Sequence, residues 1–225
     1  MGIITSLEVQ KRNKKRVNVF IEDEYAFSVS LDEAARLRKG QQLSEAEIAT
    51  LKDHAAVTVA TDQAAHFLSL RPRSVHEVRQ NLVQKDTPPA VIDAAIERLL
   101  ALGYLDDHQF ATFWVRARNQ FKPISPRALR YELRQKGIAD AIIQEALADL
   151  DADDAAYRAA QGHMRRLRGL ERRAFRDKLY VFLQRRGFSF EAARRVVSRL
   201  IEEIDAETPA FFAGGEDTTD ENDIN

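Results

Sequence analysis

The stretch that decides the fold is residues 129–150, LRYELRQKGIADAIIQEALADL, because its pattern also occurs at residues 78–99, VRQNLVQKDTPPAVIDAAIERL. The two copies lie 51 positions apart, and every apolar position of the pattern stays apolar. The matched residues are Val78, Leu82, Lys85, Val91, Ile92, Ile96 and Leu99, against Leu129, Leu133, Lys136, Ile142, Ile143, Leu147 and Leu150. Such agreement predicts a repeated structural unit in which each copy buries its apolar face against its neighbours.

A third, partial copy follows about fifty residues later. Leu133, Lys136, Gly137 and Ile138 return as Leu183, Arg186, Gly187 and Phe188, while Leu147 and Leu150 return as Val197 and Leu200. We predict that each unit has a leading helix, a second helix ending at a cation plus Asp86, Gly137 or Gly187, and a third helix.

Helix-capping residues support these unit boundaries. Ser74 to Glu77 has the pattern of a capping box, and Ser125-Pro126 places an N-cap before a first-turn proline at the equivalent point of the second unit. Pro88-Pro89 can restart a helix after Asp86, and Ser189 can cap the last one. At the joint between the first two units, Gly103 can close one helix and Asp106 can cap the next.

The first thirty residues have strand-like alternation in three runs, at 3–9, 17–21 and 25–29, which predicts a small antiparallel meander. Capping boxes at Ser30 and Ser44 then start a short helix ending at Gly40 and a longer helix reaching roughly Ala60. The stretch 58–70 has the next apolar face. We therefore predict a mainly α protein with tandem three-helix repeats and a small N-terminal antiparallel β hairpin or meander. The predicted parts are residues 1–60, 61–108, 109–153, 154–205 and a disordered acidic tail, 206–225.

The formal net charge of −1 conceals an asymmetry along the chain. Residues 206–225 carry six carboxylates and no Lys or Arg, so subtracting their −6 from −1 leaves +5 for residues 1–205. We expect this body to attract anions more strongly than the total charge indicates.

Several classes of protein are disfavoured by the sequence. The chain has no Cys, so disulfides and thiolate chemistry are excluded. The five His are scattered without metal-site spacing, no nucleotide-binding glycine motif occurs, and the adjacent Asp106 and Asp107 would point apart on a helix. No signal peptide or membrane-length apolar run is present. We predict a soluble cytoplasmic protein with no catalytic residues, metal or cofactor.

Four motifs, in order, carry a family resemblance. They are Arg71-x-Arg73-Ser74-x2-Glu77; Gly103-Tyr104-Leu105-Asp106-Asp107-x2-Phe110-Ala111; Glu132-Leu133-x2-Lys136-Gly137-Ile138; and Phe182-Leu183-x-Arg185-Arg186-Gly187-Phe188. From about Ala64 to Leu200 the chain resembles the RecX family of RecA regulators. It departs at Asp86, where the family usually has Gly, and its N-terminal strands exceed the minimal family form.

The resemblance implies an elongated, curved array of three-helix repeats that needs no cofactor. Family members bind the RecA–single-stranded DNA filament in its groove and inhibit recombinase, coprotease and ATPase activities, which places them in DNA recombination, repair and the SOS response. By this resemblance the expected partner is the RecA nucleoprotein filament, with direct contact to single-stranded DNA as a further option, and the chain is expected to be a monomer with no membrane partner.

The residues themselves indicate basic faces that could bind phosphates or acidic protein surfaces. Residues 165–186 hold nine cations against only Glu171 and Asp177, and Arg165, Arg168, Arg172 and Arg176 would share one face of a continuous helix unless Gly169 breaks it. The loop 11–16 is either a contact site or a solvated hairpin turn. The candidate binding residues are Lys11, Arg12, Lys14, Lys15, Arg71, Arg73, Lys85, Arg116, Arg118, Arg127, Arg130, Lys136, Arg165, Arg168, Arg172, Arg176, Arg185 and Arg186.

Other interpretations stay open. Some cations must form intramolecular ion pairs, with Glu77, Glu132 or the Asp106–Asp107 pair as partners. The helical spacing of Phe110, Phe113 and Trp114, and the position of Phe67, favour core packing over base stacking. The alternatives to a RecX-like regulator are a general DNA-binding protein with helix-turn-helix-like modules and a helical-repeat protein–protein adaptor.

Overall fold

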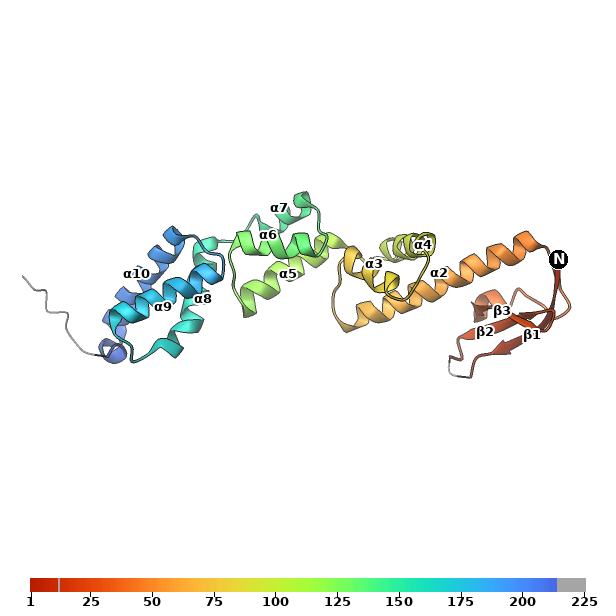
Figure 1. Cartoon of the computed structure of the whole chain (residues 1–225), viewed down its shortest axis with the longest axis horizontal. Helices are drawn as coiled ribbons and strands as arrows, with labels where there is room; N and C mark the ends of the chain where they lie inside the picture. The colour runs from red at the N-terminus through yellow and green to blue at the C-terminus, as the bar shows by residue number, and fades with distance from the viewer. Residues whose placement is uncertain (12, 214–225) are drawn as a thin grey trace, which may run out of the picture. The chain divides into compact units, whose positions relative to one another are not determined.

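The computed structural model describes residues 1–11 and 13–213, and shows a mainly helical chain with a small N-terminal sheet (Figure 1). Internal contacts divide it into two compact units, residues 1–107 and 108–225. The helix-rich fold predicted from the repeat is confirmed. The curved arrangement implied by the resemblance stays a prediction.

The N-terminal sheet has four strands in the order β3-β2-β1-β4, with antiparallel pairing throughout. Their bounds are β1 Gly2–Val9, β2 Arg16–Ile21, β3 Glu24–Ser30 and β4 Gln42–Leu43. The predicted meander is therefore confirmed, and β4 is an addition because two residues are too short to show an alternating pattern. Ile4, Val19 and Val29 point into a core that this sheet shares with α2.

A single helix, α2 (Glu45–Leu70), follows the short α1 (Leu31–Ala34). The predicted boundary at residues 60 and 61 falls inside α2, which continues through it without a break, so the division of the chain at this point stays a prediction. The first half of α2 packs on the sheet through Ala55, and its second half contributes Ala60 and Ala64 to the core of the first repeat. One helix therefore belongs to both the sheet and the first repeat.

The three predicted repeats each have three helices. The first has the second half of α2 with α3 (Val75–Val83) and α4 (Pro89–Ala101); the second has α5 (Asp107–Phe121), α6 (Pro126–Gln135) and α7 (Asp140–Leu147); the third has α8 (Ala152–Met164), α9 (Arg172–Arg185) and α10 (Phe190–Glu207). The serine caps are confirmed, since Ser74, Ser125 and Ser189 each accept a hydrogen bond from a backbone N–H of the helix they precede.

The matched apolar positions form a separate core in each repeat. Leu82, Leu133 and Leu183 are fully buried and stand at equivalent places in the three cores. Burial of these positions against neighbouring copies, as predicted from the repetition, was wrong. Three helices enclose a core of this size by themselves, so each repeat is a small helical unit with its own interior.

The ordered body also extends beyond residue 205. Helix α10 reaches Glu207, a short 3₁₀ turn (η2, Pro209–Phe211) follows, and Phe211 is 6% exposed in the core of the third repeat. Phe211 and Phe212 both pack edge-on against Phe175. The tail predicted from Ala206 therefore starts too early, because two aromatic side chains anchor this segment. The acidic residues 216–223 lie outside the described residues.

Each second helix of a repeat ends in a left-handed residue. Gly137 (φ 75°) and Gly187 (φ 83°) take this conformation at no steric cost, and Asp86 takes it in the first repeat with φ 56°. In all three, the next residue donates its N–H to a carbonyl of the last helical turn: Leu82, Leu133 or Leu183. Of these three repeats, the first is therefore the one that places an L residue, Asp86, in the left-handed conformation that favours glycine.

We expect Asp86→Gly to stabilise the chain by about 0.5–1 kcal/mol, because glycine relieves the left-handed strain that Asp86 bears. Asp86→Ala is the control and should destabilise by a similar amount, since alanine retains the strain and tolerates it less well than aspartate. Urea denaturation followed by circular dichroism measures both. A glycine variant less stable than the wild type would contradict the expectation.

Candidate functional site: the cationic surfaces

The structure separates the predicted cations into those held by a carboxylate and those that are not. Among the described residues, arginines with ion-pair partners are Arg16, Arg71, Arg79, Arg118, Arg134, Arg158, Arg172, Arg176, Arg195 and Arg199. Six of these were not among the predicted binding residues: Arg16, Arg79, Arg134, Arg158, Arg195 and Arg199. A cation already paired within the fold has less to offer an external anion, so the unpaired ones define the candidate interface.

The N-terminal loop keeps part of its predicted charge on the surface. Lys11, Lys14 and Lys15 are exposed, and Arg12 lies outside the described residues. Arg16 is buried instead: one Nη donates to the Ser28 carbonyl at 2.7 Å, and the other lies 3.5 Å from Asp62. Arg16 therefore fixes β2 against β3 and α2, and leaves the lysines as the described cations of the loop.

In the first repeat, Arg71 pairs with Glu77 at 2.9 Å, as predicted. Arg73 lies over the Phe67 ring, with Cζ 3.9 Å from its centroid. Burial lowers the pKa of Arg73, and the charge of Arg71 adds to this effect while Glu77 opposes it. Lys85 is exposed at the end of α3. The first repeat thus offers few unpaired cations, in line with the smaller number in its sequence.

The second repeat gathers polar and aromatic groups around Trp114. Glu132 accepts a hydrogen bond from Trp114 Nε1 and another from Arg118 Nε, both at 2.8 Å. Arg118 and Lys136 lie over the indole ring at 4.8 and 5.3 Å. The predicted ion pair of Glu132 is confirmed, and Arg118 is held inside this cluster. Arg116, Arg127 and Arg130 are exposed.

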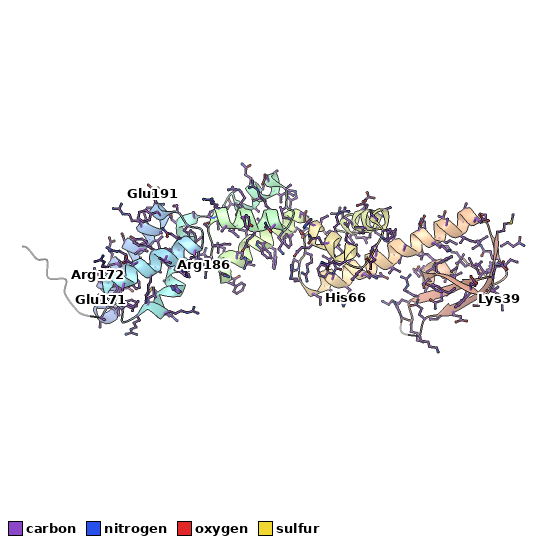
Figure 2. All side chains as sticks on the ribbon, viewed as in Figure 1. Lys39, His66, Glu171, Arg172, Arg186 and Glu191 are labelled. Atoms are coloured by element: carbon purple, nitrogen blue, oxygen red, sulfur yellow. The ribbon has the colours of Figure 1, made fainter. Side chains whose placement is uncertain are left out.

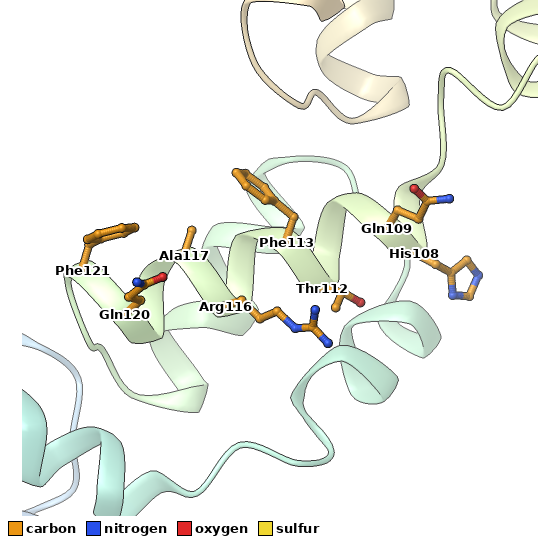
Figure 3. Close-up of a pocket in the computed structure, with 8 residues that line it drawn as sticks. All are labelled: His108, Gln109, Thr112, Phe113, Arg116, Ala117, Gln120 and Phe121. Atoms are coloured by element: carbon orange, nitrogen blue, oxygen red, sulfur yellow. The ribbon is translucent and has the colours of Figure 1, made fainter.

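The aromatic residues of α5 divide between core and surface. Phe110 is buried, as predicted, whereas Phe113 is 46% exposed and Phe121, at the end of the helix, is 79% exposed. Phe113, Ala117 and Phe121 follow one another along α5 at the wall of a depression (Figure 3). Core packing was therefore the wrong prediction for Phe113, because the position lies one step off the buried face marked by Phe110 and Trp114.

The predicted stripe of the third repeat is broken at Gly169. Helix α8 ends at Met164, a 3₁₀ turn (η1) covers Arg165–Leu167, and Gly169 has φ 80° before α9 begins at Arg172. Arg172 makes a two-pronged ion pair with Asp205, at 2.7 and 2.8 Å, and Arg176 lies 3.6 Å from Asp177. The alternative in which Gly169 breaks the helix is therefore confirmed, because a residue in the left-handed conformation is not part of a right-handed helix.

Four of the predicted cations of this repeat have no ion pair within the described part of the chain, and these four lie near its turns. Arg165 is exposed at the start of η1 and Arg168 directly follows it, while Arg185 is the last residue of α9 and Arg186 its C-cap. Figure 2 shows Arg172 and Arg186 at opposite ends of that helix. Arg186 is half-buried: one Nη donates to the Pro123 carbonyl at 2.9 Å, and burial lowers the pKa of its guanidinium.

Two further groups at this end of the repeat, His163 and Phe121, were not identified from the sequence. His163 stacks on Phe182 with ring centroids 4.0 Å apart and an interplanar angle of 1°. Phe121 contributes an exposed ring from the preceding repeat. No spacing rule could have found them, because α5, α8 and α9 bring them together only in the folded chain.

The arrangement suits the binding of anions. Within residues 1–11 and 13–213, no cluster of three or more His, Asp or Glu is placed to hold a metal ion. None of the described helices is both long and apolar enough to cross a membrane. What the surface presents is guanidinium and ammonium groups, which recognise phosphates and carboxylates.

Four domain models of one known family match the chain along most of its length. Residues 2–44 match the regulatory protein RecX N-terminal domain, and residues 60–99, 106–147 and 151–197 match the first, second and third three-helix domains of RecX. The three helical matches agree with the three repeats seen in the structure. The four sequence motifs did not cover the N-terminal strands, but the match of residues 2–44 shows that these strands also resemble RecX.

Relatives and solved structures agree with these matches. A "Regulatory protein RecX" from Bacillus subtilis is 35% identical over 214 residues, covering 92% of this chain and 81% of that protein, and one from Lactobacillus johnsonii is 37% identical over 205 residues, covering 89% and 75%. A structure titled "Crystal structure of regulatory protein RecX" aligns with a TM-score of 0.68 and 28% identity, covering 88% of this chain and all of that one. The structure of RecX from Lactobacillus salivarius shares the fold with a TM-score of 0.54 at 23% identity, over 67% of this chain and 97% of that one. The chain belongs to the RecX family of regulatory proteins.

Proposed function

We propose that this protein binds the RecA–single-stranded DNA filament and lowers its recombinase, coprotease and ATPase activities. The relatives carry the name of a regulatory protein, which supports a regulatory role. Binding to the filament and the particular activities affected are our inference. The protein acts without a cofactor, as a monomer, in the cytoplasm.

The observation that carries the proposal is the group of unpaired cations in the third repeat. Arg165, Arg168 and Arg185 are exposed and have no carboxylate partner among the described residues, although nearby arginines such as Arg172 do. An unpaired cation loses no intramolecular partner when it contacts a phosphate or an acidic side chain, so its whole Coulomb attraction is available for binding. A nucleoprotein filament offers both kinds of anion.

The mechanism is occupation of a surface rather than chemistry. Cationic repeats lying along the filament would cover the groove that other strands and substrates must enter, and would be held there by several weak contacts. Because such contacts release counterions, binding should weaken steeply with salt. The lysines of the N-terminal loop and the cations of the second repeat, Arg116, Arg127 and Arg130, would add to the same attraction.

Adding the protein to RecA on single-stranded DNA and following ATP hydrolysis tests the proposal. We expect turnover to fall as the protein approaches the amount of RecA, and the inhibition to weaken as salt is raised. Unchanged turnover at equal amounts would contradict the proposal. Sequence-selective binding to duplex DNA in the absence of RecA would instead favour a general DNA-binding protein.

A further inference from the structure

A groove lies between the second and third repeats, inside the second compact unit. It has a volume of about 390 Å³, within the roughly 300–1,000 Å³ of typical small-ligand sites. The end of α5 and the following loop form one wall, and α8, η1 and α9 form the other. The residues that matter for its chemistry are Phe121, Arg158, His163, Arg166, Phe182 and Arg186.

The groove has an excess of positive charge. Its lining holds three arginines and a histidine, and no Asp or Glu is among the lining residues. Arg158 is already held by Asp154 and Asn119, at 2.7 Å each. Arg166 and Arg186 have no ion pair within the described chain, so two guanidinium charges face the groove without compensation.

This positive charge affects the pKa of His163. Burial lowers the pKa of His163, and the charges of Arg166 and Arg186 lower it further. The same imidazole also borders a second depression, where Asp177, Lys178 and Arg185 together carry +1. Neither side therefore supplies net negative charge, and an anion entering the groove would relieve the repulsion.

The groove is built on a fixed joint. Ser125 donates its N–H to the Arg186 carbonyl at 3.0 Å, and the guanidinium of Arg186 donates to the Pro123 carbonyl. Arg186 also lies over Phe182, with Cζ 4.8 Å from the ring centroid, and His163 stacks on the same ring. Arg186 and His163 are thus oriented before any ligand arrives, which reduces the entropy lost on binding.

We propose that this groove is a phosphate-binding site for single-stranded DNA, with the exposed Phe121 ring stacking on the adjoining base. Guanidinium groups match the oxygen geometry of a phosphate, and base–aromatic stacking tolerates any sequence. The Phe121 ring is the feature that favours a nucleotide over a protein carboxylate, because a carboxylate would leave this large apolar surface in water. The inference rests on the proposed function only for which strand is bound, namely the one in the filament.

The test measures affinity of the full chain for a fluorescein-labelled oligothymidylate without RecA. Arg166→Gln and Phe121→Ala should each weaken binding about tenfold, and Arg166→Gln should also reduce the salt dependence by about one counterion. Arg173→Gln is the matched control, since it removes an exposed charge from α9 that does not line the groove, and should stay within about twofold.

A second measurement does not depend on any variant of Arg186, which could disturb the joint. In the wild-type chain, NMR titration of the imidazoles should show that adding the oligothymidylate raises the pKa of His163, with His163→Gln identifying its signal. If inorganic phosphate raises this pKa but the oligonucleotide does not, the source is free phosphate and the nucleic-acid site is overturned. If a polyglutamate peptide competes with the oligonucleotide equally well at equal charge, and Phe121→Ala has no effect, the site is one for acidic protein.

The outcome can be separated from that of the proposed function. A wild-type chain that leaves RecA turnover unchanged but binds oligothymidylate through Arg166 and Phe121 would sink the proposed function and keep the groove. A chain that inhibits RecA, and whose Arg166→Gln and Phe121→Ala variants bind oligothymidylate as the wild type does, would overturn the groove and keep the function.

Discussion

Gly187→Ala is expected to destabilise the protein by about 2–5 kcal/mol, the largest effect that we expect from removing or adding one methyl group. Two costs combine. With φ 83°, an L residue at this position is strained by about 1–2 kcal/mol. The added Cβ would also lie 2.6 Å from Ser125 Oγ and 3.1 Å from Ala128 Cβ, and such overpacking costs about 1–3 kcal/mol.

The Ser125 hydroxyl cannot easily move aside. It is buried, and its Oγ accepts the N–H of Ala128 at 3.1 Å as the N-cap of α6. A rotation that made room for the methyl group would give up this cap, which is itself worth about 1 kcal/mol. The close approach of Gly187 to Ser125 therefore joins the second and third repeats through a contact that only glycine permits.

Gly103→Ala is the matched control. Its φ of 70° imposes the same backbone strain, but no atom lies within 4 Å of the added Cβ, so the loss should be only about 1–2 kcal/mol. Urea denaturation followed by circular dichroism gives both free energies of unfolding. Equal losses in the two variants would show that the contact with Ser125 contributes nothing.

The repeat explains why so much of the fold could be predicted from sequence. Leu82, Leu133 and Leu183 are buried at equivalent positions because the same helical period recurs, and Ser74, Ser125 and Ser189 cap helices by local hydrogen bonds. Both signals involve residues close together in the chain. The unbroken α2 was missed for the opposite reason, since its two halves face different cores and only the folded structure shows that one helix serves both.

The sequence predicts the chemical character of the candidate site, a set of basic surfaces, but not which of its cations are available to a partner. The sequence indicates which segments are basic, whereas the availability of each cation depends on partners that are distant in the chain. Arg172 meets Asp205, 33 residues away, and Arg16 meets Asp62, 46 residues away. Reversing the charges of Arg165, Arg172 and Arg176 together would therefore have two effects at once. It would remove positive charge from the surface, and it would break the internal ion pairs of Arg172 and Arg176.

The set Arg165→Glu, Arg168→Glu and Arg185→Glu reverses three exposed cations that have no ion pair within the described residues. We expect this triple variant to need about 100-fold more protein for half-inhibition of RecA-catalysed ATP hydrolysis on single-stranded DNA. Each reversal removes an attraction and adds a repulsion, and exposed charges of this kind are worth up to about fivefold each. The difference from wild type should shrink as salt is raised, because screening weakens both terms.

The matched control reverses charges that are already satisfied. Arg195 pairs with Asp153 and Arg199 pairs with Glu203, both on the exposed surface of the third repeat, so Arg195→Glu with Arg199→Glu changes the net charge by a similar amount. If inhibition follows net charge alone, the control, with two reversed charges instead of three, should need about 25-fold more protein for half-inhibition. If it depends on unpaired cations, as we propose, the control should stay within about threefold of wild type. Circular dichroism of both variants establishes that the helices are intact, so that equal losses of inhibition would contradict the assignment of the interface to Arg165, Arg168 and Arg185.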